Sequence, residues 1–188
     1  MMQNKKIIGI TGSSGAGKSH ISETLRKRGF FVVDADKVAH ESINRPACVE
    51  ELAREFGEDI VKDGKIDRKM LGKAVFSAPE KLERLNGITH KYILSDIEDK
   101  IKAQKDKTVF VDGAVLIESG MECDIMVGVV ADKNIRIKRI MQRDGITEEE
   151  AKTRIAAQQK DGFYYENCDF VITNNGGEPD ISGILKRI

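Results

Sequence analysis

The sequence predicts an α/β fold in which a five-stranded parallel sheet carries helices on both faces. Short apolar runs alternate with stretches of helical spacing, a glycine-rich loop follows the first run, and acidic residues end two of the others. Strands covered on both faces read as continuous apolar runs, and parallel neighbours are joined by crossover helices. The predicted strands are residues 6–10, 30–33, 108–112, 125–130 and 169–173.

The first strand opens into a loop and then a helix. Residues 6–10 are followed by Thr11-Gly12, and after the loop Ile21 and Leu25 stand four residues apart among charged side chains. This is helical spacing, and Gly29 is a natural helix stop. The strand of residues 30–33 comes next.

A long helical stretch then interrupts the alternation. Residues 38–104 contain no run that reads as a convincing strand, and residues 79–102 predict a helix with Leu82, Leu85 and Ile93 on one side. We interpret this stretch as a helical insertion between the second and third strands. At 188 residues the chain is expected to be a single domain, 1–188, with these parts in one compact body.

A basic helix and a capped helix are predicted between the fourth and fifth strands. Residues 135–141 form an amphipathic pattern that carries several cations, with Arg143 just beyond. Thr147 and Glu150 then have capping-box spacing, in which the hydroxyl accepts from the N–H of Glu150 and the carboxylate accepts from the N–H of Thr147. The helix that follows is expected to run to about residue 159.

Composition excludes several functional classes. Lys+Arg and Asp+Glu both number 31, so the balanced chain has no general field for nucleic acid or an anionic membrane. No apolar run approaches the roughly 18 residues of a membrane-spanning helix, and the first apolar stretch is too short for a secretion signal. We therefore expect a cytoplasmic protein. Cys48, Cys123 and Cys168 are widely spaced, which predicts reduced structural thiols, and His20, His40 and His90 lack metal-ligand spacing.

The segment that most strongly indicates chemistry is the loop between the first strand and the first helix. It matches G-x-x-x-x-G-K-[ST], the phosphate-binding loop or P-loop, in the strand-to-helix context that gives the pattern meaning. The glycines permit backbone conformations that direct N–H groups at phosphates beside a helix N-terminus. The predicted ATP-binding residues are Gly12, Ser13, Ser14, Gly15, Ala16, Gly17, Lys18 and Ser19. Lys18 should reach the β- and γ-phosphates, and Ser19 should bind Mg²⁺. The alternative is an ordinary glycine-rich turn with a surface lysine.

Two carboxylates follow the second strand and are candidates to meet an acceptor hydroxyl. Asp34 and Asp36 lie at the edge of the sheet where ligands gather, and residues two apart share a face if the extended backbone persists. Either one could instead cap the following helix. We favour Asp36 for the acceptor chemistry.

Further candidates come from the basic helix and the third strand. Phosphoryl transfer spreads negative charge over the equatorial oxygens, which a mobile arginine stabilises. Arg143 is our first choice for this role and Arg139 our second, while a solvated helix face is the alternative for the basic run. Asp112 is either a second Mg²⁺ ligand, acting through water, or part of a simple Asp-Gly turn.

Taken together, these segments resemble the dephospho-coenzyme A kinase family over nearly the whole chain. The matching pieces are residues 10–19, 33–40, 63–68, Leu85-Asn86 leading to His90, 142–144, 154–158 and 168–176. The resemblance implies a nucleotide-binding core, a helical lobe that binds the coenzyme A precursor within residues 38–104, and a lid over residues 135–165. It also implies that His90 and Glu118 contact the acceptor together with Asp34 and Asp36.

Three positions depart from the family pattern. His20 stands where the family has Thr, and should contact the nucleotide; Lys91 stands where it has Pro; and residues 113–118 replace a Pro-Leu-Leu-Phe-Glu-like segment while keeping Glu118. These changes leave the residues needed for phosphoryl transfer in place.

The resulting hypothesis is transfer of the ATP γ-phosphoryl group to the ribose 3′-hydroxyl of dephospho-coenzyme A, with Lys18, Asp36 and Arg143 as catalytic residues. One alternative is a P-loop kinase for another small acceptor, such as a nucleoside or nucleoside monophosphate. Another is a nucleotide-dependent switch, but such proteins carry a guanine-reading Asn-Lys-x-Asp segment that this sequence lacks. The sequence does not indicate an oligomeric state.

Overall fold

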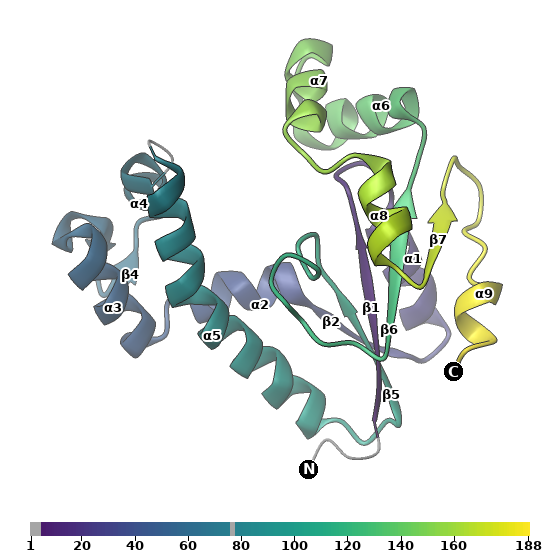
Figure 1. The fold of residues 1–188 in the computed structure, drawn as a ribbon, viewed down its shortest axis with the longest axis horizontal. Helices are drawn as coiled ribbons and strands as arrows, with labels where there is room; N and C mark the ends of the chain where they lie inside the picture. Colours follow the sequence, from purple (N-terminus) through teal and green to yellow (C-terminus); the bar gives the residue numbers. More distant parts are fainter. Residues whose placement is uncertain (1–4, 76–77) are drawn as a thin grey trace. The chain divides into compact units, whose positions relative to one another are not determined.

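The computed structural model describes residues 5–75 and 78–188 (Figure 1). Its strands are β1 (Lys6–Gly12), β2 (Phe31–Asp34), β3 (Val61–Lys62), β4 (Lys65–Ile66), β5 (Thr108–Asp112), β6 (Ile125–Val130) and β7 (Phe170–Thr173). Its helices are α1 (Lys18–Lys27), α2 (Ala35–Ser42), α3 (Pro46–Phe56), the 3₁₀ turn η1 (Glu58–Ile60), α4 (Arg68–Val75), α5 (Pro79–Ala103), α6 (Lys133–Asp144), α7 (Glu148–Ala156), α8 (Asp161–Asn167) and α9 (Ser182–Leu185).

Within the described residues, five strands form one parallel sheet in the order β2-β5-β1-β6-β7. This confirms the predicted parallel sheet, with strand ends that differ from expectation by two residues at most. The register places Asp34, Asp112 and Ile10 side by side on β2, β5 and β1. The loop after β1 and the acidic ends of β2 and β5 therefore meet at one edge of the sheet.

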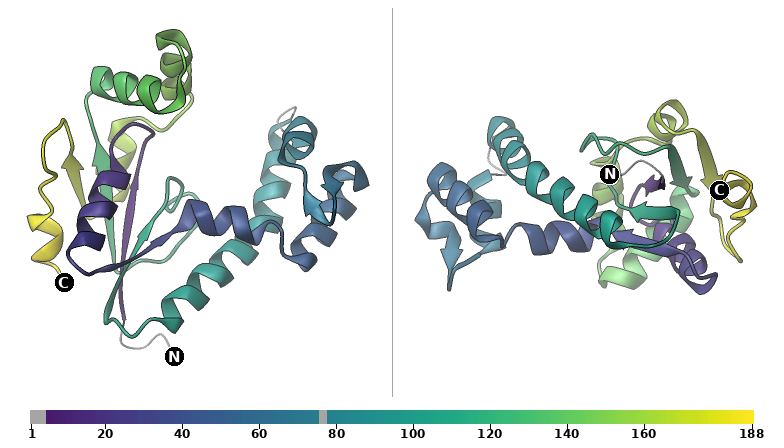
Figure 2. Two further views of the ribbon diagram at one scale, coloured as in Figure 1. Left: turned by 180° about the vertical axis from the view of Figure 1, so that it is seen from behind. Right: turned by 90° about the horizontal axis from the view of Figure 1, so that it is seen from below.

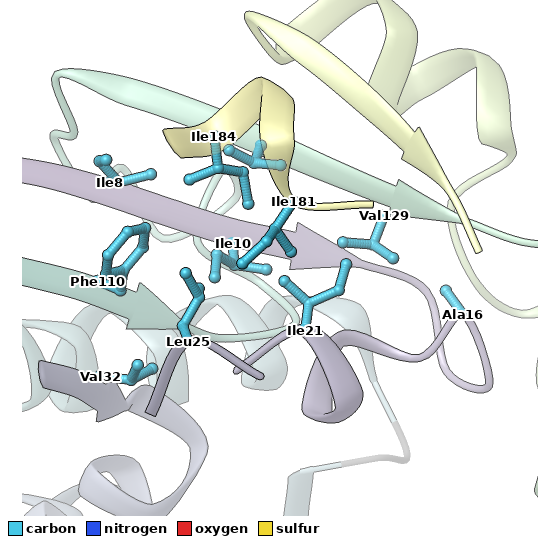
Figure 3. Close-up of a cluster of buried hydrophobic side chains, with 11 residues drawn as sticks. Ile8, Ile10, Ala16, Ile21, Leu25, Val32, Phe110, Val129, Ile181 and Ile184 are labelled. Atoms are coloured by element: carbon cyan, nitrogen blue, oxygen red, sulfur yellow. The ribbon is translucent and has the colours of Figure 1, made fainter. Parts of the chain in front are cut away.

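The main core lies on one face of this sheet, under α1 and α9. Ile8 and Ile10 of β1 pack with Ile21 of α1 and Ile184 of α9, all of them buried (Figure 3). Side chains alternate along a strand, so Gly128, between two core residues of β6, faces the other side. There a Cβ on Gly128 would lie 3.1 Å from Cβ of Tyr164 on α8. Helices thus cover both faces, as predicted.

The chain divides into two compact units, one of residues 35–103 and one of residues 1–34 with 104–188. In the first unit, α5 packs on α2, α3 and α4 around an apolar cluster that includes Cys48, Leu52 and Leu71. Leu82, predicted to share an apolar side, is exposed.

The same unit contains a hairpin that sequence analysis did not predict. β3 and β4 pair antiparallel across Asp63-Gly64, whose φ angles of 51° and 72° are left-handed. Each strand has two residues, too few to show alternation, although Asp-Gly is a known hairpin signal.

Helices α6 and α7 lie beyond the carboxyl ends of β1 and β6 (Figures 1 and 2). The capping box that begins α7 is confirmed: Thr147 Oγ1 accepts from the N–H of Glu150, and the Thr147 N–H donates to the Glu150 carboxylate over 2.8 Å. The expected extension to about residue 159 was wrong, because α7 ends at Ala156 and α8 begins at Asp161. Across residues 5–75 and 78–188, each helix is too short or too polar to cross a lipid bilayer.

Candidate phosphoryl-transfer site

The P-loop has the strained backbone that its glycines predict. Gly12, Gly15 and Gly17 have φ angles of 146°, 78° and 94°. A Cβ at Gly12 would lie 2.2 Å from the Val129 carbonyl oxygen, and one at Gly17 would lie 2.1 Å from Asn174 Nδ2. Any larger residue at either position would meet both backbone strain and a steric clash. The loop then enters α1 with Gly17 as its N-cap, and the N-terminus of a helix favours the binding of an anion.

Lys18 and Ser19 begin helix α1. Lys18 Nζ donates to the carbonyl of Gly12 over 2.8 Å, so the ammonium lies next to the first residue of the P-loop. Ser19 and His20 are exposed. His20 also lines a pocket of about 470 Å³ together with Thr24 and Gly177.

The acidic ends of β2 and β5 lie next to each other. Asp34 and Asp112 are Cα partners in the parallel register, and Asp112 Oδ2 accepts a hydrogen bond of 2.6 Å from Oγ of the buried Ser22 on α1. The bond fixes one oxygen of Asp112 beside the helix that carries Ser19. Among the described residues, no three or more His, Cys, Asp and Glu side chains form a group that could hold a metal ion.

The backbone does not stay extended between Asp34 and Asp36. We expected Asp34 and Asp36 to share a face if the backbone stayed extended, but α2 begins at Ala35 and places Asp36 in its first turn. Strand alternation therefore does not relate the two carboxylates. Asp36 belongs to the helical unit, as does the half-buried His90 on α5, whereas Asp34 belongs to the sheet unit.

Side chains of the basic helix α6 donate hydrogen bonds to backbone carbonyls of the P-loop. Arg136 is 5% exposed, and its Nε donates to the Ser14 carbonyl over 3.1 Å. Arg139 Nη1 donates to the carbonyls of Gly15, Ala16 and Asn174 at 3.0 to 3.3 Å. Of the basic run, Lys138 is exposed and fits the solvated-face alternative.

Arg143, at the end of α6, contacts the side chain of Ser14 in the P-loop, whereas Arg136 and Arg139 contact the backbone of the loop. Its Nη2 donates to Ser14 Oγ over 3.1 Å, and its Nε donates to Asp144 over 2.7 Å. The hydrogen bond to Asp144 raises the pKa of Arg143, and the same bond lowers the pKa of Asp144. Arg154 of α7 also donates to Asp144, so one carboxylate joins the two helices.

A pocket of about 360 Å³ opens beside the P-loop. It is lined by Gly12, Ser13, Ser14, Ala114, Val115, Glu118, Ala156, Ala157, Gln158, Gln159 and Tyr164. The structure thus brings Glu118 to the same pocket as the first part of the P-loop. Ser13 Oγ donates to the Tyr164 hydroxyl over 3.3 Å, and burial raises the pKa of Tyr164.

Sequence reasoning missed several side chains that shape this site. None of them belongs to a motif with a known chemistry. One is Ser22, which contacts Asp112, and three contact the P-loop: Gln158, Tyr164 and Asn174. Gln158 and Asn174 did lie in segments that carried the family resemblance. Polar residues in predicted helices and at strand ends give no sequence signal of their partners.

Two departures from the family pattern have clear local structures. Lys91 lies within the unbroken helix α5, and its Nζ is 2.5 Å from the Glu51 carboxylate of α3. After β5, Gly113 N–H donates to the Ile10 carbonyl and Thr11 Oγ1 donates to the Ala114 carbonyl, both over 3.1 Å. The replacement segment is therefore bound to β1 at the entrance to the P-loop.

Comparison with known proteins gives a consistent result. Residues 6–180 match the family model of dephospho-CoA kinase. The dephospho-CoA kinase of Fusobacterium nucleatum is 38% identical over 184 residues, which cover 96% of this chain and 95% of the relative. That of Geobacillus kaustophilus is 37% identical over 181 residues, which cover 90% and 88%.

Solved structures agree with the sequence relatives. TT1252 from Thermus thermophilus matches with a TM-score of 0.86 and 31% identity over 98% of both chains. The dephospho-CoA kinase from Campylobacter jejuni matches with a TM-score of 0.61 and 28% identity, over 100% of this chain and 98% of that one. A shikimate kinase from Bacteroides thetaiotaomicron, at 17% identity and a TM-score of 0.54 over 97% of this chain and 95% of that one, shares the fold.

Proposed function

The chain belongs to the dephospho-CoA kinase family, and we propose that its P-loop region transfers the γ-phosphoryl group of ATP to the ribose 3′-hydroxyl of dephospho-coenzyme A. It is an ATP-dependent phosphotransferase of the final step of coenzyme A synthesis. The residue roles that follow are our proposal, and the strained P-loop at the start of α1 is the observation that carries it.

The phosphates of ATP should bind at the P-loop, Gly12 to Ser19. Backbone N–H groups and the N-terminus of α1 favour negative charge there. Lys18 now donates to the Gly12 carbonyl, and a bound phosphate is the better partner, because an ionised acceptor makes a stronger hydrogen bond than a carbonyl. The pocket beside His20 offers room for the nucleoside.

Ser19 and Asp112 are the residues that would hold Mg²⁺. Mg²⁺ prefers oxygen ligands and is usually bound by one or two carboxylates together with waters and substrate phosphates. An exposed hydroxyl and a carboxylate oriented by Ser22 fit this donor set. When bound, the ion would neutralise charge on the phosphates.

The acceptor hydroxyl should meet Asp36, with Asp34 in a binding role. A ribose hydroxyl is a weak nucleophile at neutral pH, and an ionised carboxylate in hydrogen-bond reach can orient it and take its proton. Both aspartates are exposed: Asp34 is the last residue of β2 and Asp36 lies two residues beyond it, near the edge where ligands of parallel sheets bind. The reaction then needs mainly positioning and charge stabilisation.

The remaining parts of the molecule have proposed roles in binding and closure. The helical insertion of residues 38–104, with His90, should bind the acceptor, and Glu118 should contact it from the pocket beside the P-loop. Residues 135–165 should act as the lid that brings Arg143 over the transferring group. The expected cytoplasmic location stays a prediction.

A coupled assay of ADP release tests this function. With ATP and Mg²⁺, dephospho-coenzyme A should support turnover, whereas nucleosides and nucleoside monophosphates should not. Turnover with one of those acceptors instead would favour the alternative kinase. Slow ATP hydrolysis that no small acceptor accelerates would favour a nucleotide-dependent switch.

A further inference from the structure

Ser14 of the P-loop is held at each of its polar groups by residues 133–161. Gln158 Oε1 accepts from the Ser14 N–H over 3.1 Å, Arg136 Nε donates to the Ser14 carbonyl over 3.1 Å, and Arg143 Nη2 donates to Ser14 Oγ over 3.1 Å. Arg136 Nη2 also donates to Gln158 Oε1 over 3.2 Å. Ser14, Arg136 and Gln158 therefore form a closed triangle of hydrogen bonds.

This triangle controls the direction of a P-loop N–H. A peptide unit is planar and trans, so its carbonyl and its N–H point in opposite directions. The Ser14 carbonyl and the Gly15 N–H belong to one peptide unit, and the described residues contain no cis peptide bond. Arg136 thus fixes the Gly15 N–H by holding the carbonyl on the other side.

Arg136 depends on its neighbours for its own orientation. Its side chain is 6% exposed, and its ion pair with the half-exposed Asp161 spans 3.4 Å. The other terminal nitrogen of Arg136, Nη2, is held by its hydrogen bond to Gln158 Oε1. The Gln158 side chain thereby holds the Ser14 N–H directly and the Ser14 carbonyl through Arg136.

We infer that Gln158 is a positioning residue for phosphoryl transfer, whose side-chain oxygen sets the shape of the P-loop around the ATP phosphates. The inference rests on the proposed binding of ATP at this loop. Gln158 acts in both bonds through Oε1 as an acceptor. A glutamate can make the same bonds and adds an ion pair to Arg136, whereas a leucine makes neither.

The test compares Gln158→Leu and Gln158→Glu with a matched control, Asn167→Leu, which removes an exposed amide at the end of α8, outside the proposed lid. Loss of the hydrogen bonds to the half-buried Ser14 and the buried Arg136 predicts that Gln158→Leu raises KM for ATP about five- to fiftyfold. KM for dephospho-coenzyme A should stay within about twofold, and Gln158→Glu should stay within about threefold of wild type for ATP. Amide exchange by NMR, measured without ATP, should show faster exchange at Ser14 in Gln158→Leu and wild-type exchange in Gln158→Glu.

Two results would overturn the inference. One is a Gln158→Leu protein whose Ser14 exchange and KM for ATP equal those of Asn167→Leu. The other is a Gln158→Glu protein as damaged as Gln158→Leu in both measurements, which would assign the role to the amide nitrogen. If the leucine variant does not fold, Gln158→Ala takes its place. The exchange readout needs no ATP, so failure of the proposed function is seen separately, as wild-type protein that does not bind ATP.

Discussion

Arg143 Nη2 donates a hydrogen bond to Ser14 Oγ, while the same guanidinium pairs with Asp144. The arginine that we predict to act on the transferring group therefore already contacts the P-loop. Arg143→Ala should lower kcat by about 10³-fold, the low end for an arginine that stabilises transferred phosphoryl groups. Because the Arg143 side chain is 59% exposed, Tm should change little. Steady-state kinetics and a thermal melt measure both.

Arg139 provides the comparison for Arg143. It donates to three backbone carbonyls around the P-loop, so Arg139→Ala should lower Tm clearly as well as activity. If Arg139→Ala lost more kcat than Arg143→Ala while keeping the wild-type Tm, our order of the two arginines would be reversed.

Lys18→Ala should abolish turnover and leave the fold intact. The ammonium is the side-chain charge that the P-loop directs at the β- and γ-phosphates, and the side chain is only half-buried. The matched control is Lys105→Ala, an exposed lysine before the amino end of β5. A folded Lys18→Ala protein with near-normal kcat would remove the P-loop lysine from the mechanism.

Asp36→Asn should lower kcat by about 10²- to 10⁴-fold, the usual contribution of a general base, and change ATP affinity little. The substitution keeps the shape of the side chain but removes its negative charge. Asp34→Asn should lose less turnover. Both variants are compared at saturating substrates, and greater damage in Asp34→Asn would show that we chose the wrong aspartate.

The proposed lid should become more protected in the ternary complex than in the free protein. Hydrogen exchange across residues 135–165 should slow when ATP and acceptor are both present. Arg136 and Gln158 already bind Ser14 in the free protein, so we expect the larger change in α7. Unchanged exchange throughout residues 135–165, with protection elsewhere, would argue against a lid.

The three thiols should react slowly in the folded protein. Burial raises the pKa of Cys48 to about 11 and that of Cys123 to about 12, and it raises the pKa of Cys168 to about 11. The thiolate is the reactive form, so labelling by a disulfide reagent at pH 8 should be much slower than in denaturant. Because burial disfavours the thiolate, these raised pKa values should lower the free energy of unfolding as the pH rises from about 9 towards 12, whereas at lower pH the thiols are protonated in both states and add no pH dependence. Equal labelling rates in folded and denatured protein would contradict the burial.

Much of the sheet unit was predictable because its signals are local. The strand of residues 108–112 and that of residues 125–130 coincide with β5 and β6, since a buried parallel strand is a continuous apolar run. The capping box at Thr147 was equally local. The β3-β4 hairpin and the end of α7 were not predicted correctly, because two-residue strands and polar helix ends carry little periodic signal.

The sequence by itself determined the family, the P-loop and the set of acidic and basic candidates, because glycine spacing and apolar runs act through the backbone nearby. Only the tertiary structure decided which polar groups meet: Ser22 with Asp112, Arg139 with the P-loop carbonyls, and Gln158 with Ser14. Gln158 and Ser14 are far apart in the chain, and their contact depends on how α6 and the segment after α7 pack against the loop. Hydrogen-bond partners at such separations are fixed by packing, and a single sequence does not record them.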